Sequence, residues 1–395
     1  MSHRKLPRRG VHRAPATLRG LVRGAVRGQR TVADLQREAA DAFAVGHAIV
    51  TGSGRRALTA ILEALALSPG DGVLLPALTF HAVPHTIAGL GLRPVFADVD
   101  PETFLLPPTA VARHPDVRVV LATHLFGLVC DLDELGRRCA EGGARLVEDF
   151  AQAAGARWRE RPVGSWGDAG FTSLETVKPL AAFGGGLVTT SDPALARRVE
   201  ESEYALPAPD VSKLASKVAL GQLEAALGDP RFFSLAWPLF TGGLGTDASR
   251  RSEGWIQRYK ARKQGVGNHG ARLHPAQAEV ARRGLAHLDH HLSRRRTRAA
   301  ELLTALGGRG AARVIAGSEP AWYQLVVRVS DAEACADDAR RAGVDLGPGV
   351  ATDLSEGRCP NAARLAGELV QLPCHPNLDN RDLARVAEVV GPWLA

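Results

Sequence analysis

Short apolar segments alternate with helical segments through the first half of the 395-residue chain, and this alternation restricts the fold more than any other feature. Continuous apolar runs are typical of strands that are buried on both faces of a parallel sheet. Helices between such strands cover the sheet on both sides. We therefore expect an α/β fold with a mostly parallel sheet, with strands at residues 46–50, 73–76, 94–99, 118–124 and 145–149.

The composition is that of a globular protein without a membrane-spanning helix. Hydrophobic residues make up 45% of the chain and charged residues 23%. No apolar run reaches the roughly 18 residues of a transmembrane helix. The five cysteines are odd in number and include no CxxC pair, which argues against a disulfide framework or a zinc site. The length is sufficient for two domains, and we expect a cytoplasmic location.

The net charge of +7 comes from residues 1–30, which hold nine arginines and lysines and no acidic residue. This basic arm is either a solvated or partly disordered tail, or a segment that an anionic membrane surface, a phosphorylated substrate or nucleic acid attracts. Arg19, Arg23 and Arg27 recur at helical spacing, which favours an interfacial helix, although intervening glycines weaken it. We expect no binding to nucleic acid.

Residues 171–190 place one lysine, Lys178, between a strand-like run and the glycines 184–186. Glycines let the backbone approach a ligand closely before the next strand begins. Lys178 could therefore be a nucleophilic amine, although a surface lysine beside a turn is the simpler interpretation.

Three other segments carry candidate binding residues. Residues 51–56, TGSGRR, lie between a strand and a helix, where free N–H groups and the helix dipole favour phosphate. Phe80 follows a strand end, where its ring could stack on a flat ligand or lie in the core. Glu148 and Asp149 end another strand and place a carboxylate at the edge of the sheet where α/β proteins bind ligands.

In this order and spacing, the segments resemble the DegT/DnrJ/EryC1/StrS family of pyridoxal-phosphate aminotransferases, over roughly residues 32–200 and 268–392. By this resemblance Lys178 forms the Schiff base that holds pyridoxal 5'-phosphate and carries protons, and Asp149 lies beside the pyridine nitrogen. His124 is expected to be structural. The resemblance also implies that the cofactor is bound by Ser53, Gly54, Arg55, Phe80, Gln152 and Ser173.

The resemblance further implies a homodimer with the fold of type I pyridoxal-phosphate enzymes, built from a large domain and a smaller C-terminal α/β domain. We assign residues 31–265 to the large domain and residues 266–395 to a connecting helix and the small domain. Residues 201–265 are an atypical insertion, with a helix at 211–227 and an aromatic cluster. The insertion could cover the dimer, contact an apolar or membrane-bound partner, or extend the core.

The expected activity is transfer of an amino group, with glutamate as the donor, to a keto-sugar or another carrier-linked ketone. A sugar dehydratase of the same family usually has His in place of the lysine, so Lys178 argues against it. A non-catalytic or membrane-associated family member stays open, because Arg55, Glu175 and Pro179 depart from the family pattern. Gly184 is a further departure, since the family usually has a short acidic or polar residue there. We expect no metal. The run of arginines at 294–298 is expected on a solvated helix face, and Asn268 or His269 at the partner subunit's phosphate site.

Overall fold

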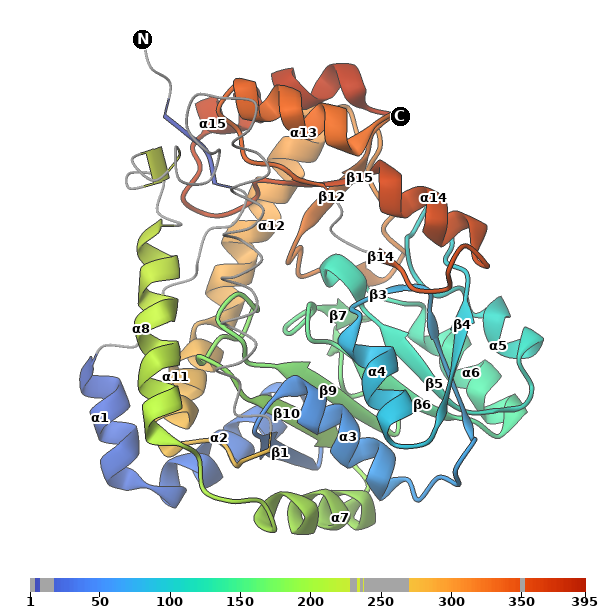
Figure 1. The fold of residues 1–395 in the computed structure, drawn as a ribbon, viewed down its shortest axis with the longest axis vertical. Helices are drawn as coiled ribbons and strands as arrows, with labels where there is room; N and C mark the ends of the chain where they lie inside the picture. Colours follow the sequence, from blue (N-terminus) through green and yellow to red (C-terminus); the bar gives the residue numbers. More distant parts are fainter. Residues whose placement is uncertain (1–3, 8–17, 228–232, 235–236, 238–269, 349–351) are drawn as a thin grey trace.

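The computed structural model describes residues 4–7, 18–227, 233–234, 237, 270–348 and 352–395. A large α/β unit fills the lower part of the molecule in Figure 1, and a smaller C-terminal unit lies above it. Helix α12 (Leu288–Ala305) runs from one unit to the other, and the described residues 4–7 and the C-terminal end both lie near the smaller unit. The predicted domain boundary at 265/266 lies outside the described residues, so it stays a prediction.

The large unit is built on a seven-stranded sheet in the order β1-β10-β9-β6-β5-β2-β4. Strand β10 runs antiparallel to both of its neighbours, and the other four neighbouring pairs are parallel. The expectation of a mostly parallel sheet is therefore confirmed. The strands are β1 (His47–Thr51), β2 (Gly72–Pro76), β4 (Arg93–Ala97), β5 (Val117–Thr123), β6 (Arg145–Asp149), β9 (Ala169–Ser173) and β10 (Gly186–Thr190).

Both faces of this sheet are buried, as the apolar runs predict. Leu74 and Val120 contribute to one hydrophobic core, whereas their neighbours Val73 and Val119 contribute to a second core on the opposite face. Successive residues of a strand point to opposite faces, so a continuous apolar run supplies both cores. The helices of this unit are α2 (Gln29–Ala42), α3 (Gly54–Ala64), α4 (Ala82–Gly89), α5 (Thr109–Arg113), α6 (Leu132–Gly142), α7 (Pro193–Tyr204) and α8 (Val211–Leu227).

The C-terminal unit contains a small antiparallel sheet in the order β12-β15-β13. Its strands are β12 (Leu325–Arg328), β13 (Gly347–Pro348) and β15 (Leu369–Leu372), and its helices are α13 (Ala332–Arg341), α14 (Pro360–Glu368) and α15 (Asn380–Val390). Two short ladders tie this half of the chain to the large unit. They join β14 (Thr352–Asp353) to β3 (Leu78–Thr79), and β11 (Ser318–Glu319) to β7 (Arg157–Trp158), which also pairs with β8 (Arg161–Pro162).

The described parts of the basic arm are packed against the protein, so the interpretation as a solvated tail is wrong for them. Leu6 is fully buried, and its backbone forms hydrogen bonds with Gly343 and Asp345 of the C-terminal unit. Arg4 forms an ion pair with Asp382 at 2.5 Å. The beginning of the chain is therefore part of the structure of its last third.

Helix α1 (Leu18–Arg27) packs closely on α11 (Pro275–Ala286). A Cβ atom at Gly24 would lie 2.6 Å from the backbone oxygen of Pro275 and 2.9 Å from Cα of Ala276. Gly20 similarly faces the Arg283 side chain. The glycines that weaken the helix in isolation therefore allow two helix backbones to approach each other.

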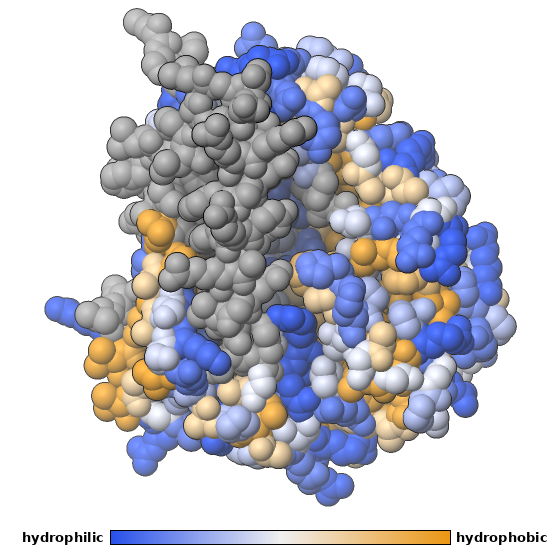
Figure 2. Space-filling view, in the orientation of Figure 1, coloured by the Kyte–Doolittle hydropathy of each residue, from blue (hydrophilic) through white to orange (hydrophobic). Residues whose placement is uncertain are grey.

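Hydrophobic surface gathers at the lower left of Figure 2, over the region that α1 and α8 occupy in Figure 1. Among the side chains of these two helices that the structure describes, the exposed large apolar ones are Val22, Val26, Val211 and Leu223. Among the described helices, none combines the length and apolar character that crossing a bilayer requires. Of the predicted aromatic cluster, Phe233 and Trp237 contact each other with ring centroids 5.4 Å apart, whereas Phe232, Leu239 and Phe240 lie outside the described residues.

Candidate active site

Lys178 lies in a loop that connects the adjacent antiparallel strands β9 and β10. Three backbone hydrogen bonds close the base of this loop: Leu174 N–H donates to the Gly185 oxygen at 2.9 Å, and Ala182 and Gly184 donate to the Leu174 oxygen at 2.8 and 3.0 Å. Leu174 and Leu180 are fully buried. Lys178 is partly buried and is thus presented by a loop with a fixed base.

The glycines after Lys178 are required by the backbone. Phe183, Gly184 and Gly185 have φ angles of 58°, 110° and 102°, a region that residues with a Cβ rarely adopt. The Gln277 side chain of α11 donates to the Ala182 and Phe183 oxygens at 3.4 and 3.1 Å. These bonds satisfy carbonyl groups in the strained part of the loop.

An aromatic ring from the second half of the chain lies beside the lysine. The Lys178 Nζ atom is 5.1 Å from the centroid of the Tyr323 ring, which is a cation–π distance. Residues next to Tyr323 bind the large unit, since Ala321 N–H donates to the Gly127 oxygen at 2.9 Å and Gln324 N–H donates to the Phe126 oxygen at 3.1 Å. Sequence reasoning missed Tyr323, because no local pattern connects it with Lys178.

Gly127 explains how the two units come this close. A Cβ atom at this position would lie 2.6 Å from the Tyr323 nitrogen and 2.9 Å from the Trp322 nitrogen, and its φ angle is +87°. Only glycine therefore lets the backbone of residues 321–324 reach the large unit. The preceding His124 is fully buried, accepts a hydrogen bond from Cys130 N–H at Nδ1, and contacts Glu148 through Nε2 at 3.2 Å. These contacts agree with the expected structural role.

The expectation that the arginines at 294–298 lie on a solvated face is wrong for two of them. Arg295 is buried and donates to the backbone oxygens of Trp322 and Tyr323 at 3.4 and 3.1 Å. Arg296 donates to the Pro320 oxygen at 2.9 Å. A charge pattern alone cannot show that a helix face meets carbonyl groups of a distant segment. Here the two arginine side chains bind such carbonyl groups and thereby position the backbone of Tyr323.

The two carboxylates at the end of β6 have different environments. Glu148 is fully buried and accepts hydrogen bonds from the backbone N–H groups of Gly164, Trp166 and Gly167, at 2.8, 2.6 and 3.0 Å. It fixes the glycine-rich turn that leads into β9. All four hydrogen bonds of Glu148, including that with His124, are structural, so this carboxylate is not the one available to a ligand.

Asp149 is also buried, but its carboxylate has a single described hydrogen bond, from Ala151 N–H at 3.0 Å. Burial raises the pKa of Asp149, and the Ala151 bond and the positive charge of Lys178 lower it only in part. The structure thus brings Asp149 and Lys178 within electrostatic reach of each other at the carboxyl edge of the sheet. Perturbed carboxylates with a specific charge partner are typical of functional sites.

The predicted phosphate residues lie together. Ser53 is the N-cap of α3, and its side chain accepts a hydrogen bond from Arg56 N–H at 3.1 Å. A Cβ atom at Gly54 would lie 2.9 Å from the Ser173 Cβ atom and 3.3 Å from its hydroxyl oxygen. The helix N-terminus and the Ser173 hydroxyl at the end of β9 therefore form one small polar site, which is suited to an anion.

The other expected cofactor residues have varied surroundings. Phe80 is 54% exposed, so the alternative of a core phenylalanine is wrong, and its described ring neighbour is His81 at 4.3 Å. Arg55 is exposed and lowers the pKa of His81 as a minor contribution after burial and His85. Gln152 accepts a hydrogen bond from Phe126 N–H at 2.9 Å, and this bond orients its side chain.

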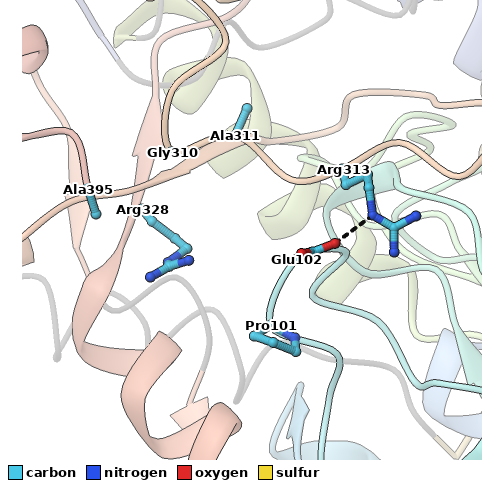
Figure 3. Close-up of a pocket in the computed structure, with 7 residues that line it drawn as sticks. All are labelled: Pro101, Glu102, Gly310, Ala311, Arg313, Arg328 and Ala395. Carbon is cyan, nitrogen blue, oxygen red and sulfur yellow. Dashed lines mark hydrogen bonds and ion pairs between the residues drawn. The ribbon is translucent and has the colours of Figure 1, made fainter.

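A cavity of about 310 Å³ lies elsewhere, between the segment after β4 and the C-terminal unit (Figure 3). The Arg313–Glu102 ion pair, at 2.8 Å, crosses its edge. None of its lining residues belongs to the lysine loop. The lining residues are Pro101, Glu102, Gly310, Ala311, Arg313, Arg328 and Ala395.

The residues of the candidate site fit pyridoxal phosphate. The group needs an amine for its aldehyde, a carboxylate for its ring nitrogen and N–H and hydroxyl donors for its phosphate. Lys178 and Asp149 would supply the first two. The helix N-terminus at Gly54 and the Ser173 hydroxyl would supply the third, and a side chain at position 54 would prevent their close approach.

A mostly parallel sheet with a glycine-rich lysine loop and a buried aspartate at its carboxyl edge defines the class of type I pyridoxal-phosphate enzymes. The chain belongs to the DegT/DnrJ/EryC1/StrS aminotransferase family, whose profile matches residues 16–229 and 248–391. The family prediction from the sequence is confirmed.

Individual relatives and structures agree with this assignment. An L-glutamine:2-deoxy-scyllo-inosose aminotransferase from Micromonospora echinospora is 40% identical over 197 residues, which cover 48% of this chain and 46% of that protein. The match thus spans about half the length of that relative. A dTDP-3-amino-3,4,6-trideoxy-alpha-D-glucose transaminase from Streptomyces venezuelae is 29% identical over 364 residues, covering 88% of this chain and 83% of that protein.

The fold prediction is confirmed by a solved structure. The crystal structure of S. venezuelae DesV in complex with a ketimine intermediate has a TM-score of 0.75 to this chain at 26% identity, and the match covers 99% of both chains.

Proposed function

We propose that this protein is a pyridoxal-phosphate-dependent aminotransferase that moves an amino group from an amino acid to a keto sugar or a related cyclic ketone. The observation that carries the proposal is that Lys178 lies close enough to the buried Asp149 for its positive charge to lower the pKa of that carboxylate, while Gly54 closely approaches Ser173. These residues are far apart in sequence, and they offer three kinds of group that would suit the cofactor.

When bound, pyridoxal phosphate supplies an aldehyde that takes up the amino group and a ring that withdraws electrons from the carbon losing its proton. Lys178 would hold the aldehyde carbon through Nζ and move that proton as a general base and acid. Asp149 would keep the ring nitrogen protonated, and a buried carboxylate does this without competition from water. Ser53, Gly54, Arg55 and Ser173 would bind the phosphate.

Three further side chains would orient the reacting groups. The exposed ring of Phe80 would stack on the cofactor, and Gln152, held by Phe126, would lie near its oxygen. Tyr323 presents the face of its ring to Lys178 and would restrict the positions that the amine can take. Restricting a reacting group in this way lowers the entropy lost on reaching the transition state.

The amino donor and acceptor classes come from relatives. Glutamate is the expected donor, and glutamine is a second candidate because the M. echinospora relative is named for it. The acceptor classes are keto sugars, as the S. venezuelae relative suggests, and keto cyclitols, as the M. echinospora relative suggests. A homodimer, a cytoplasmic location and contact of residues 1–30 or 201–265 with an anionic surface stay part of the proposal.

The test uses the purified full chain and its Lys178→Ala variant. Added pyridoxal phosphate should give the wild-type protein a visible absorbance band that survives gel filtration, and the variant should lose it. Glutamate or glutamine should then remove the band, and a keto sugar or 2-deoxy-scyllo-inosose should restore it. A protein that binds no cofactor would support the non-catalytic alternative, whereas release of water from the sugar without amino transfer would support the dehydratase.

A further inference from the structure

Helix α8 is joined to the lysine loop by an ion pair. The Lys217 Nζ atom lies 2.8 Å from Oε1 of Glu175, with side chains that are only 11% and 29% exposed. One turn further along α8, a Cβ atom at Gly221 would lie 2.7 Å from the Phe183 ring. Residues four apart lie on the same helix face, so one face of α8 contacts both ends of the loop.

Gly184 makes room for this ion pair. A Cβ atom at position 184 would lie 2.6 Å from Lys217 Nζ and 3.5 Å from the Glu175 carboxylate. The family resemblance implies a short acidic or polar residue at position 184 and an aromatic residue or His at position 175. In this chain the carboxylate belongs to Glu175 instead and lies close to the space that a side chain at position 184 would fill. Lys217 of α8 forms its ion pair with this carboxylate.

The pair acts on the part of the loop that carries Lys178. The backbone N–H of Lys178 donates to the backbone carbonyl oxygen of Glu175 at 2.9 Å, so a single hydrogen-bonded turn connects the two residues. On the other side, Gln277 holds the Phe183 oxygen at 3.1 Å. Removing one member of this largely buried ion pair removes a charged contact between α8 and the loop, so the loop is held less firmly.

We propose that Glu175 and Lys217 are positioning residues, through which α8 holds the loop so that Lys178 keeps its place beside Tyr323 and near Asp149. This inference rests on the proposed function of Lys178 as the amine that reacts. It assigns a role to the two departures at 175 and 184, and it makes α8 part of the catalytic unit.

The test is a double-mutant cycle in the full chain, with Lys217→Met, Glu175→Gln and the double variant. Lys213→Met is the matched control, because Lys213 lies one turn earlier on α8 with an exposed side chain. Hydrogen exchange of residues 174–185, measured without added cofactor, reports on the loop itself. Thermal unfolding of each variant separates a local change from a loss of the fold.

Each single variant should speed exchange in the loop and lower kcat by roughly tenfold, with KM changed less than about twofold. The double variant should have a kcat no lower, and a loop exchange no faster, than the more affected single variant. Lys217→Arg should retain the wild-type kcat and the wild-type loop exchange. Lys213→Met should leave exchange and kcat unchanged.

Additive effects in the double variant, or unchanged loop exchange in Lys217→Met, would overturn the proposal. The outcome is distinguishable from failure of the proposed function. If the wild-type protein has no transaminase activity, the proposed function is wrong, but hydrogen exchange in the four proteins of the cycle still measures whether the ion pair holds the loop. If it is active and the cycle shows no coupling, only the positioning role fails.

Discussion

Replacing Glu148 by Gln should destabilise the protein more than any neutralisation of a surface carboxylate. The two Glu148 oxygens accept four hydrogen bonds in a fully buried site, three from backbone N–H groups and one with His124. In glutamine one oxygen becomes an NH₂ donor. Each Glu148 oxygen accepts two of the four hydrogen bonds, so whichever oxygen is replaced, two N–H donors lose their acceptor and face the new NH₂ group.

The magnitude follows from that count. A buried donor that loses its acceptor costs about 1 to 3 kcal/mol, so two of them predict a loss of about 2 to 6 kcal/mol in the free energy of unfolding. Glu141→Gln is the control, because Glu141 is exposed on α6 and should change stability by less than about 0.5 kcal/mol.

Asp149→Asn, one residue along the same strand, should have the opposite profile. Burial raises the pKa of Asp149, so the ionised form is disfavoured in the fold and an uncharged amide should preserve or increase stability without cofactor. Because the folded pKa is raised, the stabilising contribution of Asp149 is present at low pH and is lost as pH rises above its ordinary 3.8 through the folded pKa. The variant should lose this dependence, and it should lose transaminase activity by at least about 100-fold.

Urea unfolding of the cofactor-free proteins at several pH values is the assay, with activity measured after addition of the cofactor. A loss below about 1 kcal/mol for Glu148→Gln would refute the assignment of Glu148 as the structural carboxylate. Equal losses of stability in the two variants would refute the division of roles between these neighbours.

Three further changes test particular contacts. Tyr323→Leu should lower kcat about 2- to 5-fold through loss of the ring face beside Lys178, and Tyr323→Phe should retain it, as steady-state kinetics would show. Gly54→Ala places a Cβ atom 2.9 Å from Ser173 and should weaken pyridoxal phosphate binding about tenfold in a fluorescence titration; an unchanged affinity would contradict the phosphate site. Gly24→Ala should lower stability by about 1 to 3 kcal/mol because of the close α11 backbone, whereas Gly136→Ala, with open space around it, should raise stability by up to about 1 kcal/mol in urea unfolding.

Much of the large unit could be predicted from the sequence because its strands are continuous apolar runs. The predicted strand at 145–149 has the observed bounds of β6, and the predicted helix at 211–227 has those of α8. The reversed direction of β10 could not be predicted from its composition. The two-residue strands β3 and β14 have no periodicity that a sequence pattern could show.

The candidate site divides in the same way. Lys178, Asp149 and Ser53 lie in local contexts with a chemical meaning, namely a glycine-rich loop, a strand end and a helix start. Tyr323 and Lys217 reach the lysine loop only through contacts between distant segments. Arg295 shows the limit of charge patterns, because its burial depends on backbone oxygens that no residue type reveals.

Leu6 has a consequence for how the protein is made. It leaves the ribosome long before Val344, beside which it lies in the folded protein. Domains generally fold as they emerge, so the large unit can form while these first residues have no partner. When the C-terminal unit folds, Leu6 forms its backbone hydrogen bonds with Gly343 and Asp345. Removing residues 1–30 would therefore impair the folding of the C-terminal unit. A change in activity after such a truncation would reflect the loss of these contacts as well as the loss of positive charge.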